Sequence, residues 1–303
     1  MKMPNFFIVG APRCGTTALT EYLRAHPRVY MSEPKEPHYF ALDFPRYRDV
    51  TNKRDYQALF ESANSTHSMI GEASVFYLYS QAAAKEIRKS LPASRLVVLL
   101  RNPLEVAVSM HAKALEAREE NVEDFTRAWA LCEGRRLGQQ IPRNCLDAKA
   151  LFYDRIPLLG QQLQRLLEIF PREQVGWWFY EDLLGNPDRM YCEVLDFLHL
   201  SHDGRTEFPR VNSSARARSQ VFAQFTEKTP APLRQGAMEI KRWLGIKRWG
   251  VLDTLRRINV RPARPPDLPP ALIEEMRAHF TPDVRLLAVL TGRDLGHWLQ
   301  EDA

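Results

Sequence analysis

The stretch from Asn5 to Leu19 constrains the fold more than any other part of the chain. A short apolar run over 6–9 stops at Gly10, passes through Ala-Pro-Arg-Cys-Gly and resumes as a helical pattern at Thr16. This order predicts a strand, a tight turn and a helix. The first amides of a helix lack intrahelical partners and carry the positive end of its dipole, so they can hold an anion. We therefore expect a phosphate-binding loop.

The glycine spacing is that of a nucleotide-binding loop, but one key residue differs. Gly10 and Gly15 fit the pattern G-x-x-x-x-G, whereas Thr16 stands where kinases and ATPases have lysine. In this chain the positively charged side chain lies earlier, inside the loop, at Arg13. The alternative is a plain strand-to-helix turn that binds nothing.

Length and charge narrow the class of protein. The 303 residues can bury a sizeable core, and 45% hydrophobic with 26% charged residues is typical of a globular chain. The net charge is only +5, from 42 basic and 37 acidic residues. This balance favours a site for a polyanionic small molecule over a nucleic-acid-binding surface.

Cysteine usage and apolar runs suggest a compartment. The four cysteines form neither a C-x-x-C pair nor a metal-ligand spacing with the eight histidines, so we expect reduced thiols in a cytoplasmic protein. No apolar run approaches the roughly 18 residues that span a bilayer. The first expected strand begins almost at the first residue, so we expect neither a signal peptide nor an anchor.

Strand and helix patterns alternate along the chain. The strands after the first are expected over 29–31, 69–74, 95–100 and 175–180, and the helices over 16–25, 81–91, 104–116, 122–137, 156–170, 187–200, 270–280 and 284–290. The uninterrupted apolar run 95–100 is expected at the centre of the sheet. The alternation predicts an α/β fold of the P-loop type, with three layers, a mainly parallel central sheet flanked by helices, and a helical C-terminal part.

We expect one domain over 1–303. Its α/β core covers 1–200, and 201–303 adds a covering loop and a mostly helical, basic region. Within 234–264 there are nine Lys or Arg against two acids, with Trp243 and Trp249 among them. Such a segment can contact an acidic partner or lie at a membrane surface, or it can be a solvated basic helix covering the core.

Polar residues follow two of the expected strands. Residues 32–40 contain two prolines that keep the loop extended, and the loop carries Lys35, Glu36 and His38. In a parallel sheet these side chains would face the same crevice as Arg13, because ligands bind beyond the carboxyl ends of the strands.

The second expected strand that a polar residue follows is the run 95–100, and that residue is Arg101. Asn102 can cap the next helix and Pro103 suits its first position. Ser109 lies on that helix. The alternative is that Arg101 only pairs with Glu105 and that Ser109 is an ordinary helix hydroxyl. We expect His111, farther along, to be a packing residue.

These segments together resemble the sulfotransferases that use 3′-phosphoadenosine 5′-phosphosulfate (PAPS). The resemblance rests on residues 10–17, the Lys-Glu-Pro-His-Tyr-Phe loop at 35–40, and Arg101-Asn102-Pro103 with Ser109. It extends through 180–183 and 212–219 to 292–295, so it covers most of the chain. It is closest to bacterial members and to the heparan-sulfate and tyrosylprotein branches.

The resemblance implies a donor site and no metal requirement. Arg13, Cys14, Gly15, Thr16 and Thr17 would hold the 5′-phosphate, and Arg101 with Ser109 would hold the 3′-phosphate. The segment 212–219, expected to be a loop, would close over the donor through Ser213, Arg216 and Arg218. The alternative is that these two arginines are solvated charges.

The resemblance also implies the catalytic residues. Sulfuryl transfer is expected to be an in-line displacement, with Arg13 stabilising charge on the leaving phosphate. Many relatives have lysine there, and an arginine scarcely gives up a proton. Glu36 would be the base, assisted by Lys35 and His38. His38 itself and Glu72 are the alternative bases, and Glu36 as a surface carboxylate and His38 as a packed ring are the structural alternatives.

Two other functions stay open, and so does the acceptor. A P-loop nucleotide kinase is disfavoured by Thr16, and a non-catalytic nucleotide-binding relative is disfavoured by the presence of both Arg13 and Glu36. The acceptor, a hydroxyl rather than an amine, can belong to a small molecule, a carbohydrate, a lipid or a carrier-bound product. The sequence does not indicate an oligomeric state.

Overall fold

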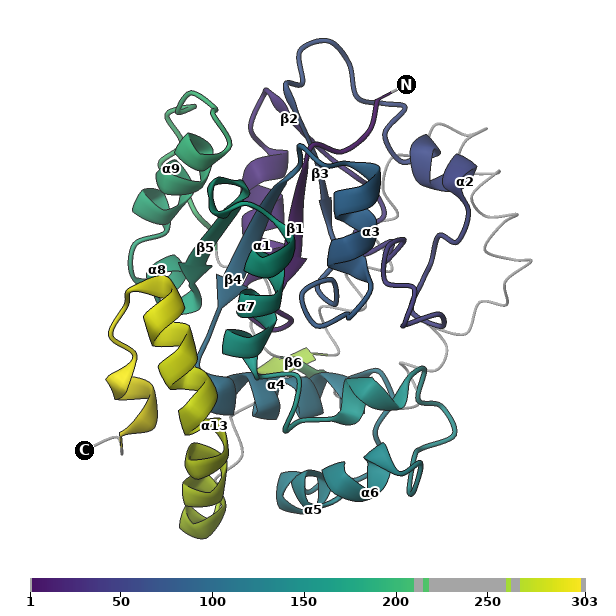
Figure 1. Cartoon of the computed structure of the whole chain (residues 1–303), viewed down its shortest axis with the longest axis vertical. Helices are drawn as coiled ribbons and strands as arrows, with labels where there is room; N and C mark the ends of the chain where they lie inside the picture. Colours follow the sequence, from purple (N-terminus) through teal and green to yellow (C-terminus); the bar gives the residue numbers. More distant parts are fainter. Residues whose placement is uncertain (1, 210–214, 218–259, 263–267, 301–303) are drawn as a thin grey trace. The chain divides into compact units, whose positions relative to one another are not determined.

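A five-stranded parallel sheet forms the centre of the computed structural model (Figure 1). The structure describes residues 2–209, 215–217, 260–262 and 268–300. The strands follow the order β2-β3-β1-β4-β5 and are β1 (Phe6–Gly10), β2 (Val29–Met31), β3 (Met69–Ala73), β4 (Arg95–Leu100) and β5 (Val175–Phe179). The predicted α/β fold with a parallel sheet is confirmed.

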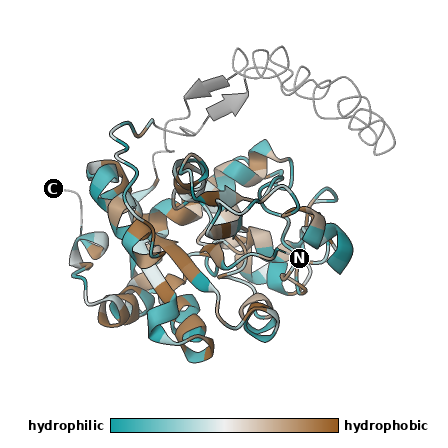
Figure 2. Cartoon of the chain, turned by 90° about the horizontal axis from the view of Figure 1, so that it is seen from above, coloured by the Kyte–Doolittle hydropathy of each residue, from teal (hydrophilic) through white to brown (hydrophobic). Residues whose placement is uncertain are grey.

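The apolar run 95–100 does not occupy the centre. The middle strand is β1, and β4 lies between β1 and β5. Both strands are buried on both faces, which is why their composition alone does not tell them apart. Figure 2 shows hydrophobic strands inside and hydrophilic colour on the outer sides of the helices.

Helices cover both faces of the sheet. They are α1 (Thr16–Arg24), α2 (Lys53–Ala58), α3 (Ala83–Ser90), α4 (Pro103–Glu116), α5 (Phe125–Ala130), α6 (Cys132–Arg136), α7 (Leu159–Ile169), α8 (Tyr180–Gly185), α9 (Pro187–Phe197) and α13 (Pro270–Thr291). Short 3₁₀ turns lie at η1 (Ala148–Leu151), η2 (Arg172–Gln174) and η3 (Gly296–Leu299). Helix α1 lies on one face, and α3 and α7 pack together on the other (Figure 1).

Two expected helices differ in detail. The helix expected over 122–137 is two short helices, α5 and α6, because the Asp124 side chain caps α5 at the Arg127 amide and the second helix starts anew after Leu131. The two helices expected over 270–290 are one, α13, which continues through Pro282. Packing of α13 against α7 compensates for the hydrogen bond that a proline removes.

The start of α7 depends on a distant residue. The buried Asp283 of α13 accepts hydrogen bonds from the amides of Gly160 and Gln161, both at 2.8 Å. These are among the amides that α7 cannot pair internally. A Cβ at Gly160 would lie 2.4 Å from the Asp283 carbonyl oxygen, so the two helices touch at backbone distance.

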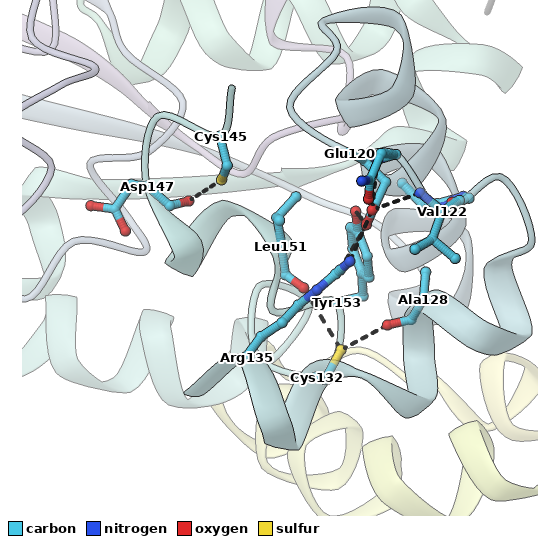
Figure 3. A network of polar contacts seen from close by, with 11 residues as sticks. Glu120, Val122, Ala128, Cys132, Arg135, Cys145, Asp147, Leu151 and Tyr153 are labelled. Atoms are coloured by element: carbon cyan, nitrogen blue, oxygen red, sulfur yellow. Dashed lines mark hydrogen bonds and ion pairs between the residues drawn. The ribbon is translucent and has the colours of Figure 1, made fainter. Parts of the chain in front are cut away.

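A second buried polar cluster joins the end of α4 to α6. Arg135 donates to both oxygens of Glu120, at 2.7 and 2.9 Å, and both side chains are fully buried. The Tyr153 hydroxyl also donates to Glu120, at 2.9 Å (Figure 3). Nearby, Cys132 and Cys145 are free and their thiols contact backbone carbonyls, and Cys14 and Cys192 are free as well.

The chain separates into two compact units, one comprising 1–211 with 266–303 and the other Asn212–Pro265. In the second unit the structure describes β6 (Ala215–Ala217) and β7 (Val260–Pro262), which pair antiparallel. Part of the expected loop 212–219 is therefore a strand, because a partner far along the chain completes its ladder. The single-domain organisation stays a prediction. In the described ranges, no helix is both long and apolar enough to cross a membrane.

Candidate active site

The loop between β1 and α1 is shaped by two glycines. Gly10 has φ 145° and Gly15 has φ 89°, in the region that favours glycine. A Cβ at Gly15 would lie 2.5 Å from Leu183 and 3.0 Å from Tyr180. Within the described part of the chain, the amides of Gly15, Thr16 and Thr17 donate to no protein acceptor. Unpaired amides at a helix start make this loop suitable for an anion.

Three side chains form what we call the arginine flank of this loop: Arg13, Arg101 and Ser109. The Arg13 Nε donates to Ser109 Oγ at 2.7 Å, and Arg101 Nη1 donates to the Arg13 carbonyl oxygen at 2.8 Å. They meet because parallel strands bring the ends of β1 and β4 to one edge. Asn102 caps α4 at the Leu104 amide and Pro103 is its first residue, as predicted.

Arg101 is fixed from two further sides. Its Nε donates to Glu105 at 2.6 Å, which is the pairing expected as the alternative. Its guanidinium also lies 4.2 Å from the centre of the Tyr180 ring. Arg101 therefore has both a structural partner and a place next to the loop. Burial lowers the pKa of Arg13, an effect that the charge of Glu116 opposes and that of Arg101 adds to.

On the other side, Lys35, Glu36 and His38 form the carboxylate flank. Lys35 Nζ lies 3.3 Å from Thr17 Oγ1 and 2.5 Å from Glu36 Oε1. The ammonium group of Lys35 thus connects the loop between β1 and α1 to the carboxylate of Glu36. His38 Nε2 lies 3.6 Å from the other oxygen of Glu36. The expectation that these side chains gather at the crevice of Arg13 agrees with this geometry.

The electrostatics keep Glu36 ionised. Burial alone would raise the pKa of Glu36, but the hydrogen bond from His38 and the charge and hydrogen bond of Lys35 outweigh it and lower the pKa to about 2. The side chain is 35% exposed, so it can reach a ligand. The carboxylate is therefore a proton acceptor at neutral pH.

The backbone of the carboxylate flank is strained. Glu36 has φ 63° and His38 has φ 49°, values that residues other than glycine rarely adopt. His38 is 3% exposed, and its Nδ1 has no partner among the described residues. Such strain persists where the surrounding structure enforces it, and it gathers at functional sites.

Glu72, the third candidate base, does not face this crevice. It is 0% exposed, and its oxygens accept hydrogen bonds from Ser74, Tyr56 and Tyr77. A carboxylate closed in this way cannot meet an acceptor hydroxyl. The same strand end carries Ser74, whose role the sequence did not suggest.

The remaining predicted site residues differ in accessibility. The Cys14 side chain is fully buried, burial raises the pKa of its thiol to about 12, and its amide donates to Ala11 at 3.4 Å. The Thr16 side chain is also buried, whereas Thr17 reaches Lys35. His111 packs in the core and bonds the Val122 carbonyl at 2.8 Å, as expected.

The predicted donor residues of the segment 212–219 are divided between the second unit and the residues outside the described ranges. Ser213 and Arg218 lie outside the described residues, and Arg216 belongs to β6 of the second unit. The basic segment 234–264 lies outside as well, except for β7. Sequence reasoning gave no role to Tyr180, which supports Arg101 and lies beside Gly15. Its position directly after a parallel strand was the available signal. Among the described residues, no group of three His, Cys, Asp or Glu side chains is arranged to hold a metal ion.

Comparison with known proteins gives one consistent result. Residues 3–225 match the family model described as "Sulfotransferase domain". Heparan sulfate glucosamine 3-O-sulfotransferase 6 of Mus musculus is 28% identical over 301 residues, which covers 97% of this chain and 74% of that protein. Carbohydrate sulfotransferase 15 of Rattus norvegicus is 28% identical over 246 residues, 65% of this chain. The alignment spans only 44% of that relative's length.

One solved structure is similar in fold over nearly the whole length of this chain. The crystal structure of a sulfotransferase from Alicyclobacillus acidocaldarius superposes with a TM-score of 0.73 at 25% identity, covering 99% of this chain and 100% of that one. The parallel sheet and its flanking helices are thus shared with that protein.

Proposed function

We propose that this chain, which belongs to the sulfotransferase domain family, moves a sulfuryl group from PAPS to a carbohydrate hydroxyl. Sulfuryl transfer is the chemistry of the family. The choice of a sugar acceptor follows the names of the relatives, a carbohydrate sulfotransferase and a glucosamine 3-O-sulfotransferase. One observation carries the proposal: the ammonium group of Lys35 contacts both Thr17 of the loop and the carboxylate of Glu36.

The residues present fit such a donor. The unpaired amides of Gly15, Thr16 and Thr17 suit a phosphate at the start of α1. Ser109 can accept from Arg13 and still donate to a second phosphate, because a hydroxyl has both capacities. Arg101, held beside them, adds the charge that phosphate recognition needs. Bound there, the donor supplies an activated sulfuryl group with a phosphate as its leaving group.

Two side chains would perform the chemistry. Arg13 lies inside the loop, where it can stabilise charge that grows on the leaving phosphate more than charge in the ground state. Glu36 would take the proton of the acceptor hydroxyl, because it is ionised and partly exposed. The two are supplied by opposite flanks of one loop, as an in-line displacement requires.

Lys35 would couple donor binding to the strength of the base. A carboxylate with a pKa of about 2 is a weak base, and Lys35 contributes to that low value. An anion held by the loop competes with Glu36 for the same ammonium group. Losing Lys35 raises the pKa of Glu36, so the base strengthens when the donor is in place.

The test uses the full chain with ³⁵S-labelled PAPS and three probes: a heparosan hexasaccharide, glucosamine and 4-nitrophenol. We expect label on a saccharide. By calorimetry, 3′,5′-adenosine bisphosphate should bind about 10- to 100-fold more tightly than 5′-AMP, because the 3′-phosphate adds charge-assisted hydrogen bonds. Equal affinity for the two nucleotides would overturn the donor assignment. Label on 4-nitrophenol alone would overturn the sugar acceptor. Turnover of ATP with Mg²⁺ would favour the kinase.

The non-catalytic alternative makes a different prediction. In that case the bisphosphate binds but no probe is labelled, and Glu36→Ala changes nothing measurable. Loss of transfer in Glu36→Ala with intact bisphosphate binding would support the enzyme.

A further inference from the structure

Glu72, at the end of β3, is a buried carboxyl group that the proposed chemistry does not use. Its side chain is fully buried, and no lysine or arginine of the described residues forms an ion pair with it. Burying a carboxylate without a counterion costs free energy unless hydrogen bonds compensate. Its three partners must therefore matter to the fold around it.

All three partners are hydroxyl groups. Ser74 donates to one oxygen of Glu72 at 2.6 Å, and Tyr56 and Tyr77 donate to the other at 2.6 and 3.2 Å. Burial raises the pKa of Glu72, and these hydrogen bonds lower it in part. Because the oxygens of Glu72 accept from all three hydroxyls, the three hydroxyl protons point toward this side chain.

With their protons fixed, two of these hydroxyls are left as acceptors for the loop of the carboxylate flank. Ser74 Oγ accepts from the His38 amide at 3.1 Å. Tyr77 Oη accepts from the Phe40 amide at 3.2 Å. The third partner, Tyr56, stacks on Tyr39 with ring centres 4.2 Å apart and planes at 12°. Each hydroxyl partner thus holds a different residue of the loop 38–40.

The loop needs this support. Glu36 and His38 both have positive φ, and the Glu36 amide is tied to the Ala73 carbonyl oxygen at 2.9 Å, one residue from Glu72. The strained backbone is therefore anchored along the end of β3, and Glu72 lies behind most of its anchors.

We propose that Glu72 is a positioning residue for sulfuryl transfer: through Ser74 and Tyr77 it fixes the backbone that aims Glu36 and His38. The expected effect on the transfer rate rests on the proposed function. The expected effect on the loop backbone rests on the hydrogen bonds alone. Misplacing a catalytic group by about 1 Å can lower a rate by about a hundredfold.

The sharpest variant is Glu72→Gln. An amide at this position has one oxygen to accept and one NH₂ group that must donate. If the oxygen serves the two tyrosines, the NH₂ faces Ser74 and competes with the His38 amide for Ser74 Oγ. Glu72→Gln keeps the side-chain volume, but the hydroxyl protons of Ser74, Tyr56 and Tyr77 can no longer all point toward residue 72. Ser74→Ala and Tyr77→Phe each remove one link, and they serve if Glu72→Gln does not fold.

The chain offers a matched control. Tyr153→Phe also removes a tyrosine hydroxyl from a buried carboxylate, Glu120, in the cluster of Figure 3. Among the described residues, Tyr153 forms no hydrogen bond or ring contact with either flank, so this variant should lose thermal stability as Tyr77→Phe does without changing the transfer rate.

The first measurement is amide hydrogen exchange by ¹⁵N NMR. In Glu72→Gln and Ser74→Ala we expect the His38 amide to exchange about fivefold faster or more, and in Tyr77→Phe the Phe40 amide, while the amides of β1 stay protected. Tyr153→Phe should leave both loop amides unchanged. Unchanged exchange in Glu72→Gln and Ser74→Ala would overturn the proposal, whether or not the protein transfers sulfate.

The second measurement separates positioning from stability. In Glu72→Gln we expect kcat to fall about 10- to 100-fold with the affinity for 3′,5′-adenosine bisphosphate unchanged within twofold. An equal fall of kcat in Tyr153→Phe, or faster loop exchange with unchanged kcat, would overturn the role. A wild-type chain that transfers no sulfate would refute the proposed function and leave the exchange result standing.

Discussion

The two flanks of the loop are built in opposite ways. On the arginine flank the functional side chains hold one another: Arg13 bonds Ser109, and Arg101 bonds the backbone of Arg13. On the carboxylate flank, Glu36 and His38 sit on a strained backbone that other residues support from behind. The difference teaches that the proposed anion site is held by its own side chains, whereas the proposed proton transfer would depend on a buried cluster behind the loop. Lys35, on the carboxylate flank, contacts both Glu36 and Thr17 of the loop.

The largest effect should come from Glu36→Gln. Removing the proposed base should lower the transfer rate by about 10²- to 10⁴-fold, since general base catalysis contributes that much. Affinity for 3′,5′-adenosine bisphosphate, measured by calorimetry, should stay within about twofold. A variant that keeps more than a tenth of the rate would contradict the assignment of Glu36, and with it the carboxylate flank, to proton transfer.

Arg13→Ala should follow, with a fall in kcat of about 10²- to 10³-fold, as for the loss of one group that stabilises transition-state charge. Arg13→Lys is the control, because it keeps a cation but loses the fixed geometry toward Ser109. Single-turnover rates should rank wild type, lysine, alanine. Equal rates for the lysine and alanine variants would mean that charge at this position is not what matters.

Arg101→Ala should act mainly on binding. We expect the bisphosphate to bind about 10- to 100-fold more weakly, with a smaller change in kcat, because charge-assisted hydrogen bonds to the donor are lost. Arg172 is a matched control: it also stacks on an aromatic ring, 3.6 Å from the centre of Trp177, but away from both flanks. A similar loss of affinity in Arg172→Ala would assign the effect to stability.

The smallest effect at neutral pH should be that of Lys35→Met, and it should appear as a change in the pH profile. Lys35 helps to lower the pKa of Glu36 to about 2, so its removal raises that pKa. The base works only when deprotonated, so the acid limb of kcat/KM should move to higher pH. On that limb kcat/KM falls about tenfold for each step of one in pH, so even a small displacement is measurable. Lys113→Met, which removes a lysine that pairs with Glu116, should leave the limb in place. An unmoved limb in Lys35→Met would contradict the coupling.

The same low pKa has a consequence for stability. Because the folded pKa of Glu36 lies below its ordinary value of 4.5, its interactions stabilise the fold above that value and are lost as pH falls from there toward 2. Thermal unfolding of Glu36→Gln should be less sensitive to pH across this window than that of the wild type.

The arginine flank could be predicted from the sequence because its parts are adjacent in the chain or follow directly from a strand. The loop 10–17 is indicated by its glycines and a helix start, and Asn102 with Pro103 marks the start of α4. The parallel alternation then places Arg101 beside the loop.

The support of the carboxylate flank could not be predicted. Ser74 and Tyr77 follow β3 directly and Tyr56 belongs to α2, and their residue types in the sequence are those of any half-buried surface. Glu72 itself suggested a base because a carboxylate at a strand end is typical of one. Only its complete burial excludes that role. The prediction for the centre of the sheet was likewise wrong, since β1 and β4 are equally apolar.

The cap that Asp283 provides to α7 has a consequence for how this polypeptide is completed during synthesis. Until α13 emerges, the amides of Gly160 and Gln161 lack the carboxylate that satisfies them, and the face of α7 that touches α13 stays open. The ribosome must therefore finish the intervening segment before the first unit can close. A chain ended before residue 268 would lack this carboxylate and leave that face of α7 exposed, so we expect it to be degraded faster than the full chain.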